Sequence, residues 1–368
     1  MNTRPAEDAS QAQAAPTTQA LAEGALGVAL LHIEHGDLAA ARPLLAEAVR
    51  GGVSTGANAS LFHGAPALEF VLHRAGHADP VVQAAVDRVV TARLSAAARR
   101  HAAGRLAPLA EFDLISGLTG LAALLLTRPS TPSLLPQVLT YLVSLARPAD
   151  TDLDLPGWWS PGNPAHEPVT GGYSDNGMAH GIAGPLAALA LAARHGIHVP
   201  GQAHAIETFA RWLETFGSSY WTIRTQLLTD APAAPAASSP ARRPSWCYGD
   251  LGIARALHLA ALATGNPARR QAAEDLALTA LTDPARLALI TDASLCHGWA
   301  GLLTTTRAIA ADSPDPGRFT DHLGHLTGCL ADSIDALAKP GFMEGHAGAR
   351  LALDGTDATG WTRALLLT

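Results

Sequence analysis

Two segments of the chain place a cysteine at the same point of one local pattern. SWCYGDLG begins at Ser245 and SLCHGWAG begins at Ser294, and both read Ser-x-Cys-x-Gly-x-x-Gly. The cysteines are Cys247 and Cys296, and His297 follows the second one directly. Thiolate and imidazole both suit zinc, and three protein ligands leave a fourth tetrahedral position open, as in catalytic zinc sites. The pattern therefore predicts a Zn²⁺ site formed by Cys247, Cys296 and His297.

The alternative is that both cysteines are small buried hydrophobic residues. An isolated Cys–His pair is weak evidence for a metal, but the shared pattern in two separate segments favours the metal site. The third cysteine, Cys329, lies in the polar segment TGCLADSIDAL and is interpreted as structural. Three cysteines without a secretion signal argue for a reducing compartment and against a disulfide framework.

A histidine occupies the matching position in another copy of the pattern. His180 stands one residue before a glycine in HGIAGPLAALAL, as His297 does in HGWAGLLTT. We expect both side chains to face the same region, which makes His180 a candidate general acid or base. The alternative is that His180 caps its own helix. For His63, which has the same position in HGAPALEFVL, we keep that simpler interpretation.

Two charged residues lie just upstream of the same pattern. Asp113 precedes Gly117 by four residues in FDLISGLTG, and Arg243 precedes Cys247 by four in RRPSWCYGD. A carboxylate at this place can orient a histidine or a cation, or it can cap a helix. An arginine can stabilise a developing anion, or it can be a solvated loop residue beside Arg242.

The elements that position these residues repeat along the chain. A Gly-x-x-Gly frame followed by an Ala/Leu-rich run occurs seven times, and only the second copy lacks its second glycine, which is Ala67. The copies are 40 to 68 residues apart, the size of a supersecondary unit. The first glycines of the seven frames are Gly24, Gly64, Gly117, Gly181, Gly249, Gly298 and Gly345.

Each repeat has the pattern of a helical hairpin, with an amphipathic outer helix, a loop and a nearly all-apolar inner helix. Seven such hairpins bury their inner helices by closing into a ring. The sequence therefore predicts an all-α fold, an α/α toroid or double-layered barrel of seven helical hairpins, without a sustained strand pattern. An open solenoid is the competing architecture, but it would leave much apolar surface exposed. In the ring, all frame glycines and the residues before them lie at one mouth.

The chain has 368 residues, of which 48% are hydrophobic and 15% charged, with a net charge of −7. No basic stripe suggests nucleic-acid binding, and no apolar run of about 20 residues suggests a transmembrane segment. Residues 1–18 are predicted to be a disordered tail, and residues 19–368 a single domain. The Pro/Gly-rich segments 147–171 and 229–245 are predicted to be loops, either at the rim of the mouth or simple tethers.

Together, SWCYGDLG, SLCHGWAG and AHGIAGPLAAL resemble the motifs of the LanC-type lanthionine synthetases, and DLISGLTG and FMEGHAGARLAL match further signatures of that family. The resemblance covers about Leu21 to Thr368. It implies a seven-hairpin α/α barrel with zinc held by Cys247, Cys296 and His297. The residues that match the family's active site are His180, Asp113, Arg243 and Tyr248.

The resemblance also implies an activity and partners. A dehydratase converts Ser and Thr of a ribosomal precursor peptide, leader plus core, to dehydroalanine and dehydrobutyrine. The cyclase then adds cysteine thiols to them, which forms lanthionine and methyllanthionine rings. We expect a stand-alone cytoplasmic cyclase that works with the dehydratase and exporter of its pathway, with membrane association only through such a complex.

Other functions stay open at this point. A LanC-like protein can instead add glutathione to dehydrated peptides, and a zinc prenyltransferase also activates a thiolate in an α/α barrel. The prenyltransferase should line its cavity with aromatic residues, which are only 5% here. A toroid glycosidase needs two opposed carboxylates and no zinc. A non-catalytic peptide scaffold would need neither the zinc ligands nor His180.

Overall fold

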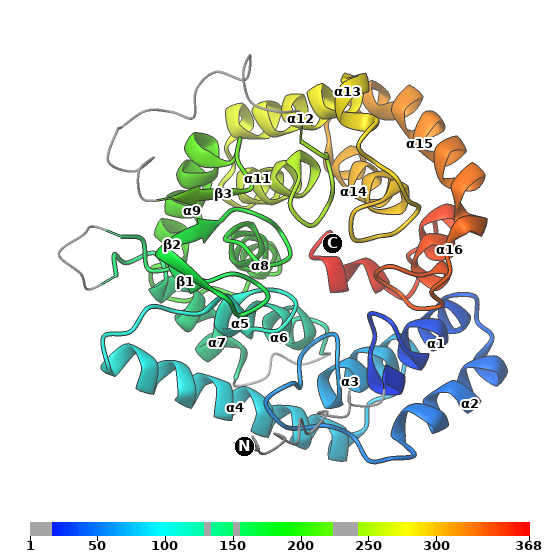
Figure 1. Ribbon diagram of the computed structural model, residues 1–368, viewed down its shortest axis with the longest axis horizontal. Coiled ribbons are helices and arrows are strands. Elements are labelled where there is room, and N and C mark those ends of the chain that lie inside the picture. The colour runs from blue at the N-terminus through cyan, green and yellow to red at the C-terminus, as the bar shows by residue number, and fades with distance from the viewer. Residues whose placement is uncertain (1–16, 129–133, 150–154, 224–241) are drawn as a thin grey trace, which may run out of the picture.

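The computed structural model describes residues 17–128, 134–149, 155–223 and 242–368. Two concentric layers of helices form a closed ring, which confirms the predicted α/α toroid (Figure 1). The inner helices are rich in Ala and Leu and are buried along most of their length. They are α1 (Ala25–Glu34), α3 (Ala65–Arg74), α6 (Leu118–Leu125), α8 (Ala183–Arg194), α11 (Asp250–Thr264), α14 (Trp299–Asp312) and α16 (His346–Asp354).

The outer helices of the described residues surround this inner layer (Figure 1). Seven were expected, and the described residues contain six long outer helices. They are α2 (Leu38–Val49), α4 (Pro80–Ala102), α7 (Leu135–Ser144), α9 (Gln202–Phe216), α12 (Pro267–Thr282) and α15 (Thr320–Ser333). Shorter pieces connect the layers: η1 (Thr17–Gln19), α5 (Leu109–Phe112), α13 (Pro284–Leu287), η2 (Pro316–Phe319) and η3 (Ile334–Ala336).

The last inner helix is not followed by an outer one. After α16 the chain forms the 3-10 helix η4 (Trp361–Leu365) and ends in the centre of the ring (Figure 1). Leu365 and Leu367 are fully buried there. The indole of Trp246 donates to the Leu365 carbonyl at 3.1 Å, and the Arg255 guanidinium donates to the Leu367 carbonyl. Apolar residues that follow the last repeat thus fill the centre instead of covering the outside.

A small antiparallel sheet stands beside the helices. Its strands are β1 (Ser160–Gly162), β2 (Pro168–Asp175) and β3 (Trp221–Ile223), in the order β1-β2-β3. The segment 147–171, predicted as a loop, therefore carries β1 and the start of β2. The sequence prediction missed the sheet because β1 and β3 have three residues each, too few for a period-2 pattern.

The second glycine of each frame is required by a close backbone approach. A Cβ added at Gly252 would lie 2.0 Å from the Trp246 carbonyl oxygen, and one at Gly301 would lie 2.2 Å from that of Leu295. In both cases the loop folds back against the first helical turn. The second copy is different, because Gly64 has a φ of +71° and enters its helix in another way.

Backbone hydrogen bonds connect the loops of neighbouring repeats around the mouth. The amide of Ala179 donates to the Cys247 carbonyl at 3.1 Å, and the Cys247 amide donates to that of Cys296 at 3.2 Å. The series continues from Cys296 to Met343 at 3.0 Å and from Met343 to Ala22 at 2.9 Å. All five residues stand two positions before the first glycine of their frame. Equivalent positions of successive repeats therefore lie side by side.

Parts of the sequence predictions fall outside the described residues. They are residues 1–16 of the predicted tail, 150–154 of the first loop and 229–241 of the second. Within the described part, η1 already includes Thr17 and Thr18, which were assigned to the tail. None of the described helices combines the length and the apolar character needed to cross a bilayer.

Candidate metal centre and active site

Cys247, Cys296 and His297 meet at the mouth of the toroid. Each offers one ligand atom, and these atoms all lie within 4.8 Å of one another. Cys247 is buried, while the other two residues are partly accessible. The cause is the loop-to-loop hydrogen bond between the two cysteine positions, which brings residues 49 apart in sequence into contact. No other group of this kind occurs in the described part of the chain.

The electrostatics of the two cysteines suit a cation. A hydrogen bond from Cys296 lowers the pKa of the Cys247 thiol to about 6 against the effect of burial, with help from Ser245, His297 and Arg243. The same hydrogen bond, together with burial, raises the pKa of Cys296. The thiol of Cys247 therefore loses its proton more readily than that of Cys296, and a metal that binds both sulfurs would displace the remaining proton.

Asp292 holds the ring of His297, and the sequence reasoning missed it. Its carboxylate lies 3.0 Å from His297 Nε2 and also accepts the Ser294 amide at 2.8 Å. The hydrogen bond with Asp292 raises the pKa of His297. A carboxylate behind a histidine ligand is the common outer partner of zinc sites, and it leaves Nδ1 to face a metal. The sequence feature that could have revealed Asp292 is a carboxylate five residues before His297 in the same loop.

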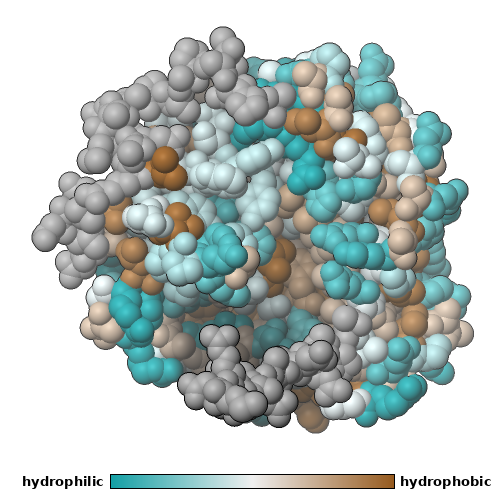
Figure 2. Space-filling view, in the orientation of Figure 1, coloured by the Kyte–Doolittle hydropathy of each residue, from teal (hydrophilic) through white to brown (hydrophobic). Residues whose placement is uncertain are grey.

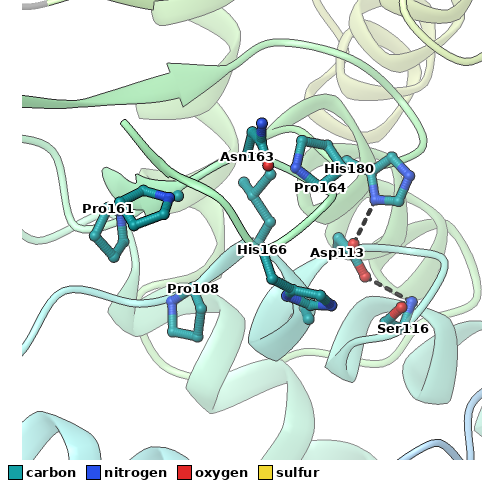
Figure 3. A pocket seen from close by; sticks show the side chains of 12 residues that line it. Pro108, Asp113, Ser116, Pro161, Asn163, Pro164, His166 and His180 are labelled. Carbon is teal, nitrogen blue, oxygen red and sulfur yellow. Dashed lines mark hydrogen bonds and ion pairs between the residues drawn. The ribbon is translucent and has the colours of Figure 1, made fainter. Parts of the chain in front are cut away.

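Asp113 and His180 form a second pair, shown in Figure 3. His180 Nδ1 lies 2.6 Å from Asp113 Oδ2, and the other carboxylate oxygen accepts the amides of Ser116 at 2.7 Å and Gly117 at 2.8 Å. Asp113 thus contacts a histidine and also holds the turn just before α6, although no side chain caps the first turn of that helix. His180 contacts Asp113 instead of the backbone of its own helix, which speaks against the capping interpretation of His180.

The pairing changes the protonation of His180. Burial alone would lower the pKa of the imidazole, but the hydrogen bond and charge of Asp113 outweigh burial and raise it. Asp175, at the end of β2, is a further buried carboxyl group near this pair. Burial raises the pKa of Asp175 to about 7, and its carboxylate accepts the Gly177 amide at 2.9 Å. The sequence analysis did not identify Asp175, because no pattern in the local sequence indicated that it ends a strand.

Tyr248 connects the two parts of the site, and Arg243 lies near the Cys/His cluster. The Tyr248 ring stacks on His180, with ring centres 6.0 Å apart and planes 30° apart, and Tyr248 follows Cys247 in the chain. The charge of Arg243 acts on Cys247, Cys296 and His297. All seven predicted site residues therefore gather at one mouth. Arg242 points elsewhere, because it pairs with Asp250.

His63 and Cys329 were not assigned to the metal site or to catalysis. His63 lies in short backbone bridges with Ala20 and Ser60, and burial lowers its pKa. Cys329 lies on α15 with its sulfur 3.6 Å from His325 Nε2, outside the Cys/His cluster. Neither residue joins the seven at the mouth.

Two cavities open beside the stacked pair. One, of about 230 Å³, is lined by Asp113 and His180 (Figure 3). The other, of about 420 Å³, is lined by Asp175 and Tyr248. Asn163 of the β1–β2 hairpin lines both. A larger cavity of about 590 Å³ lies between α9, α11 and α12, but none of the seven site residues lines it.

The fold and the site together define an α/α toroid with a two-cysteine, one-histidine cluster and an Asp–His pair at its mouth. Residues 15–366 match the family described as "Lanthionine synthetase C-like protein", and the chain belongs to this family. The solved structure of a nisin cyclase is similar, with a TM-score of 0.77 and 19% sequence identity over 95% of this chain and 92% of that one. At this identity the likeness supports the fold. No protein among the curated sequences matches the chain.

Proposed function

We propose that the protein is a zinc-dependent lanthipeptide cyclase. It adds cysteine thiolates of a dehydrated precursor peptide to dehydroalanine or dehydrobutyrine and so forms thioether rings. The observation that carries this proposal is the convergence of the Cys247/Cys296/His297 cluster with the Asp113–His180 pair at one mouth. Membership of the lanthionine synthetase C-like family supports the same class of reaction.

The ligand set fits zinc by its chemistry. Two thiols, one imidazole and a carboxylate behind that imidazole are typical of zinc, and three protein ligands leave one position for a substrate. When bound there, zinc would keep the substrate cysteine as a thiolate at neutral pH.

The remaining residues have roles in the addition step. The thiolate sulfur forms a bond to the β-carbon of the dehydro residue, and the electron pair of the double bond moves toward the α-carbon and its carbonyl oxygen. Arg243 stabilises the enolate charge. His180, whose pKa is raised by Asp113, delivers a proton to the α-carbon. The thiol proton leaves to solvent, so the mass of the peptide does not change.

The proposed reaction also defines the partners. The substrate is a precursor peptide with leader and core, dehydrated by a separate enzyme, and the product is exported by another protein of the pathway. We place the reaction in the cytoplasm, where thiols stay reduced.

The direct test incubates the purified protein with a dehydrated peptide that carries one cysteine. Since cyclisation is mass-neutral, the free thiol is alkylated before mass spectrometry, and ring closure appears as loss of the alkylated species. We expect rapid closure with the native protein and none above background with Cys296→Ala. Closure at the background rate with zinc-loaded native protein would refute the proposal. The same assay with added glutathione distinguishes cyclisation from the alternative function, the addition of glutathione to the peptide, because a glutathione adduct increases the peptide mass.

A further inference from the structure

The cavity of about 420 Å³ beside Tyr248 has one wall made by the sheet. Tyr173 pairs with Ile223 across the strands, and Asp175 pairs with Trp221. Directly opposite residues share a face of a sheet, and so do residues two apart along a strand. These four side chains therefore stand on one face, and all four line the cavity together with Tyr248.

The outer part of this wall is apolar and accessible. Trp221 is 53% exposed and Ile223 is 43% exposed, whereas Thr222 between them is buried. Figure 2 shows hydrophobic residues around the small sheet on the left of this face. The other large exposed hydrophobic residues of the described chain do not line this cavity; they are Leu38, Val49, Val81 and Leu289.

The inner part of the wall is polar. Tyr173 is 4% exposed, and its hydroxyl is buried without a hydrogen-bond partner within the described residues. Asp175 is buried beside it. A buried hydroxyl without a partner is unfavourable, and the amide or carbonyl of a bound peptide would supply one. The volume of the cavity is within the range of small-ligand pockets.

The cavity and the proposed active site share Tyr248. One wall includes Tyr248, whose ring stacks on His180, and Cys247 precedes it in the chain. A peptide residue in the cavity would therefore contact the tyrosine that stacks on the proposed proton donor.

From this geometry we propose that the cavity binds a large apolar or aromatic side chain of the substrate peptide, next to the dehydro residue. Trp221 and Ile223 provide the hydrophobic contact and act as specificity-determining residues. Asp175 at the inner end disfavours an acidic side chain. This inference rests on the proposed function for the identity of the peptide, and it adds a sequence preference to that function.

The test uses four synthetic peptides with one dehydroalanine, one cysteine and a variable residue after the dehydroalanine, which is Phe, Leu, Gly or Glu. We expect the native protein to cyclise the Phe and Leu peptides about tenfold or more faster in kcat/KM than the Gly and Glu peptides. Trp221→Ala and Ile223→Ser should each reduce the Phe-to-Gly ratio by about fivefold, mainly through KM. Val81→Ala is the control, since Val81 is 77% exposed on α4, and it should keep the native ratio.

A binding measurement separates this inference from the proposed function. The same peptides with S-methylated cysteine cannot react, and their affinities are measured by calorimetry. If no peptide cyclises but the Phe peptide binds better than the Gly peptide and Trp221→Ala removes the difference, the cavity assignment stands while the cyclase proposal fails. Equal affinities for the Phe and Gly peptides, or an unchanged ratio in Trp221→Ala, would overturn the assignment. A change in oligomeric mass on Trp221→Ala without a change in the ratio would also overturn it, because a second copy would then cover the surface.

Discussion

At the scale of single residues, a variant of His180 distinguishes the proposed proton donor from a metal ligand. We expect His180→Ala to keep full zinc content and to change the free energy of unfolding by no more than about 1–2 kcal/mol. Turnover of a dehydrated peptide should fall by about 10²- to 10⁴-fold, the contribution of a positioned proton donor. Elemental analysis and the alkylation assay measure the two quantities. Loss of zinc in this variant would mean that the ligand set is wrong.

Asp113 controls the pH at which His180 loses its proton. Its carboxylate raises the pKa of His180, so the imidazolium persists to higher pH than in an isolated histidine. Asp113→Asn keeps an oxygen for the amides of Ser116 and Gly117 but loses the charge. We expect lower kcat and an alkaline limb of the pH–rate profile that moves to lower pH. An alkaline limb at the native position would show that another group titrates.

Asp292 is predicted to tune the metal through His297. Asp292→Asn removes the charge that lies 3.0 Å from the ring, and partners of this kind usually contribute about 10- to 100-fold to metal affinity. Chelator competition should therefore show weaker zinc binding at the same stoichiometry. Native affinity in Asp292→Asn would contradict the role of this carboxylate.

At the scale of elements, the start of every inner helix except α3 depends on the backbone contact of the second glycine of its frame. Gly252→Ala would place a Cβ 2.0 Å from the Trp246 carbonyl, directly before Cys247. We expect a loss of about 3 kcal/mol, at the upper end of the usual range for overpacking, together with weaker zinc binding. Urea unfolding and elemental analysis measure both effects.

Gly324→Ala is the matched control for this element. Gly324 lies within α15, and an added Cβ there meets nothing within 4 Å. Because alanine is the better helix former by about 0.5–1 kcal/mol, this variant should be at least as stable as the native protein. If Gly252→Ala were equally well tolerated, the close approach would not be what requires glycine in the frame.

At the scale of the whole molecule, the toroid should fold without its metal. The candidate zinc ligands lie in loops at the mouth, whereas the inner helices and the central Leu365 and Leu367 form a large core independent of them. We expect one zinc per chain as purified, and a chelated protein that keeps its helical far-UV spectrum but melts at a lower temperature. This differs from zinc fingers, which unfold without metal. A spectrum of an unfolded chain after chelation would show that zinc holds the fold together.

The sequence by itself determined the toroid and which candidate site residues would converge at its mouth. The apolar inner helices and the Gly-x-x-Gly frames are local signals, and their repetition places Cys247, Cys296, His297 and His180 at equivalent positions. Successive repeats of a closed ring are adjacent, so equivalence in sequence becomes proximity in space. The same logic explains why Asp113 and Arg243, at fixed offsets from their frames, also reach the mouth.

Only the tertiary structure decided the features that depend on distant neighbours. The three-stranded sheet pairs residues of β2 and β3 that are 46 to 50 positions apart in sequence, and β3 has three residues, too few to show a strand pattern. The raised pKa of Asp175 comes from burial, which its local sequence does not encode. The place of the last residues was also undetermined, because apolar side chains at the end of the chain can cover the outside of a ring or fill its centre. They fill the centre here, where the carbonyls of Leu365 and Leu367 meet donors from Trp246 and Arg255.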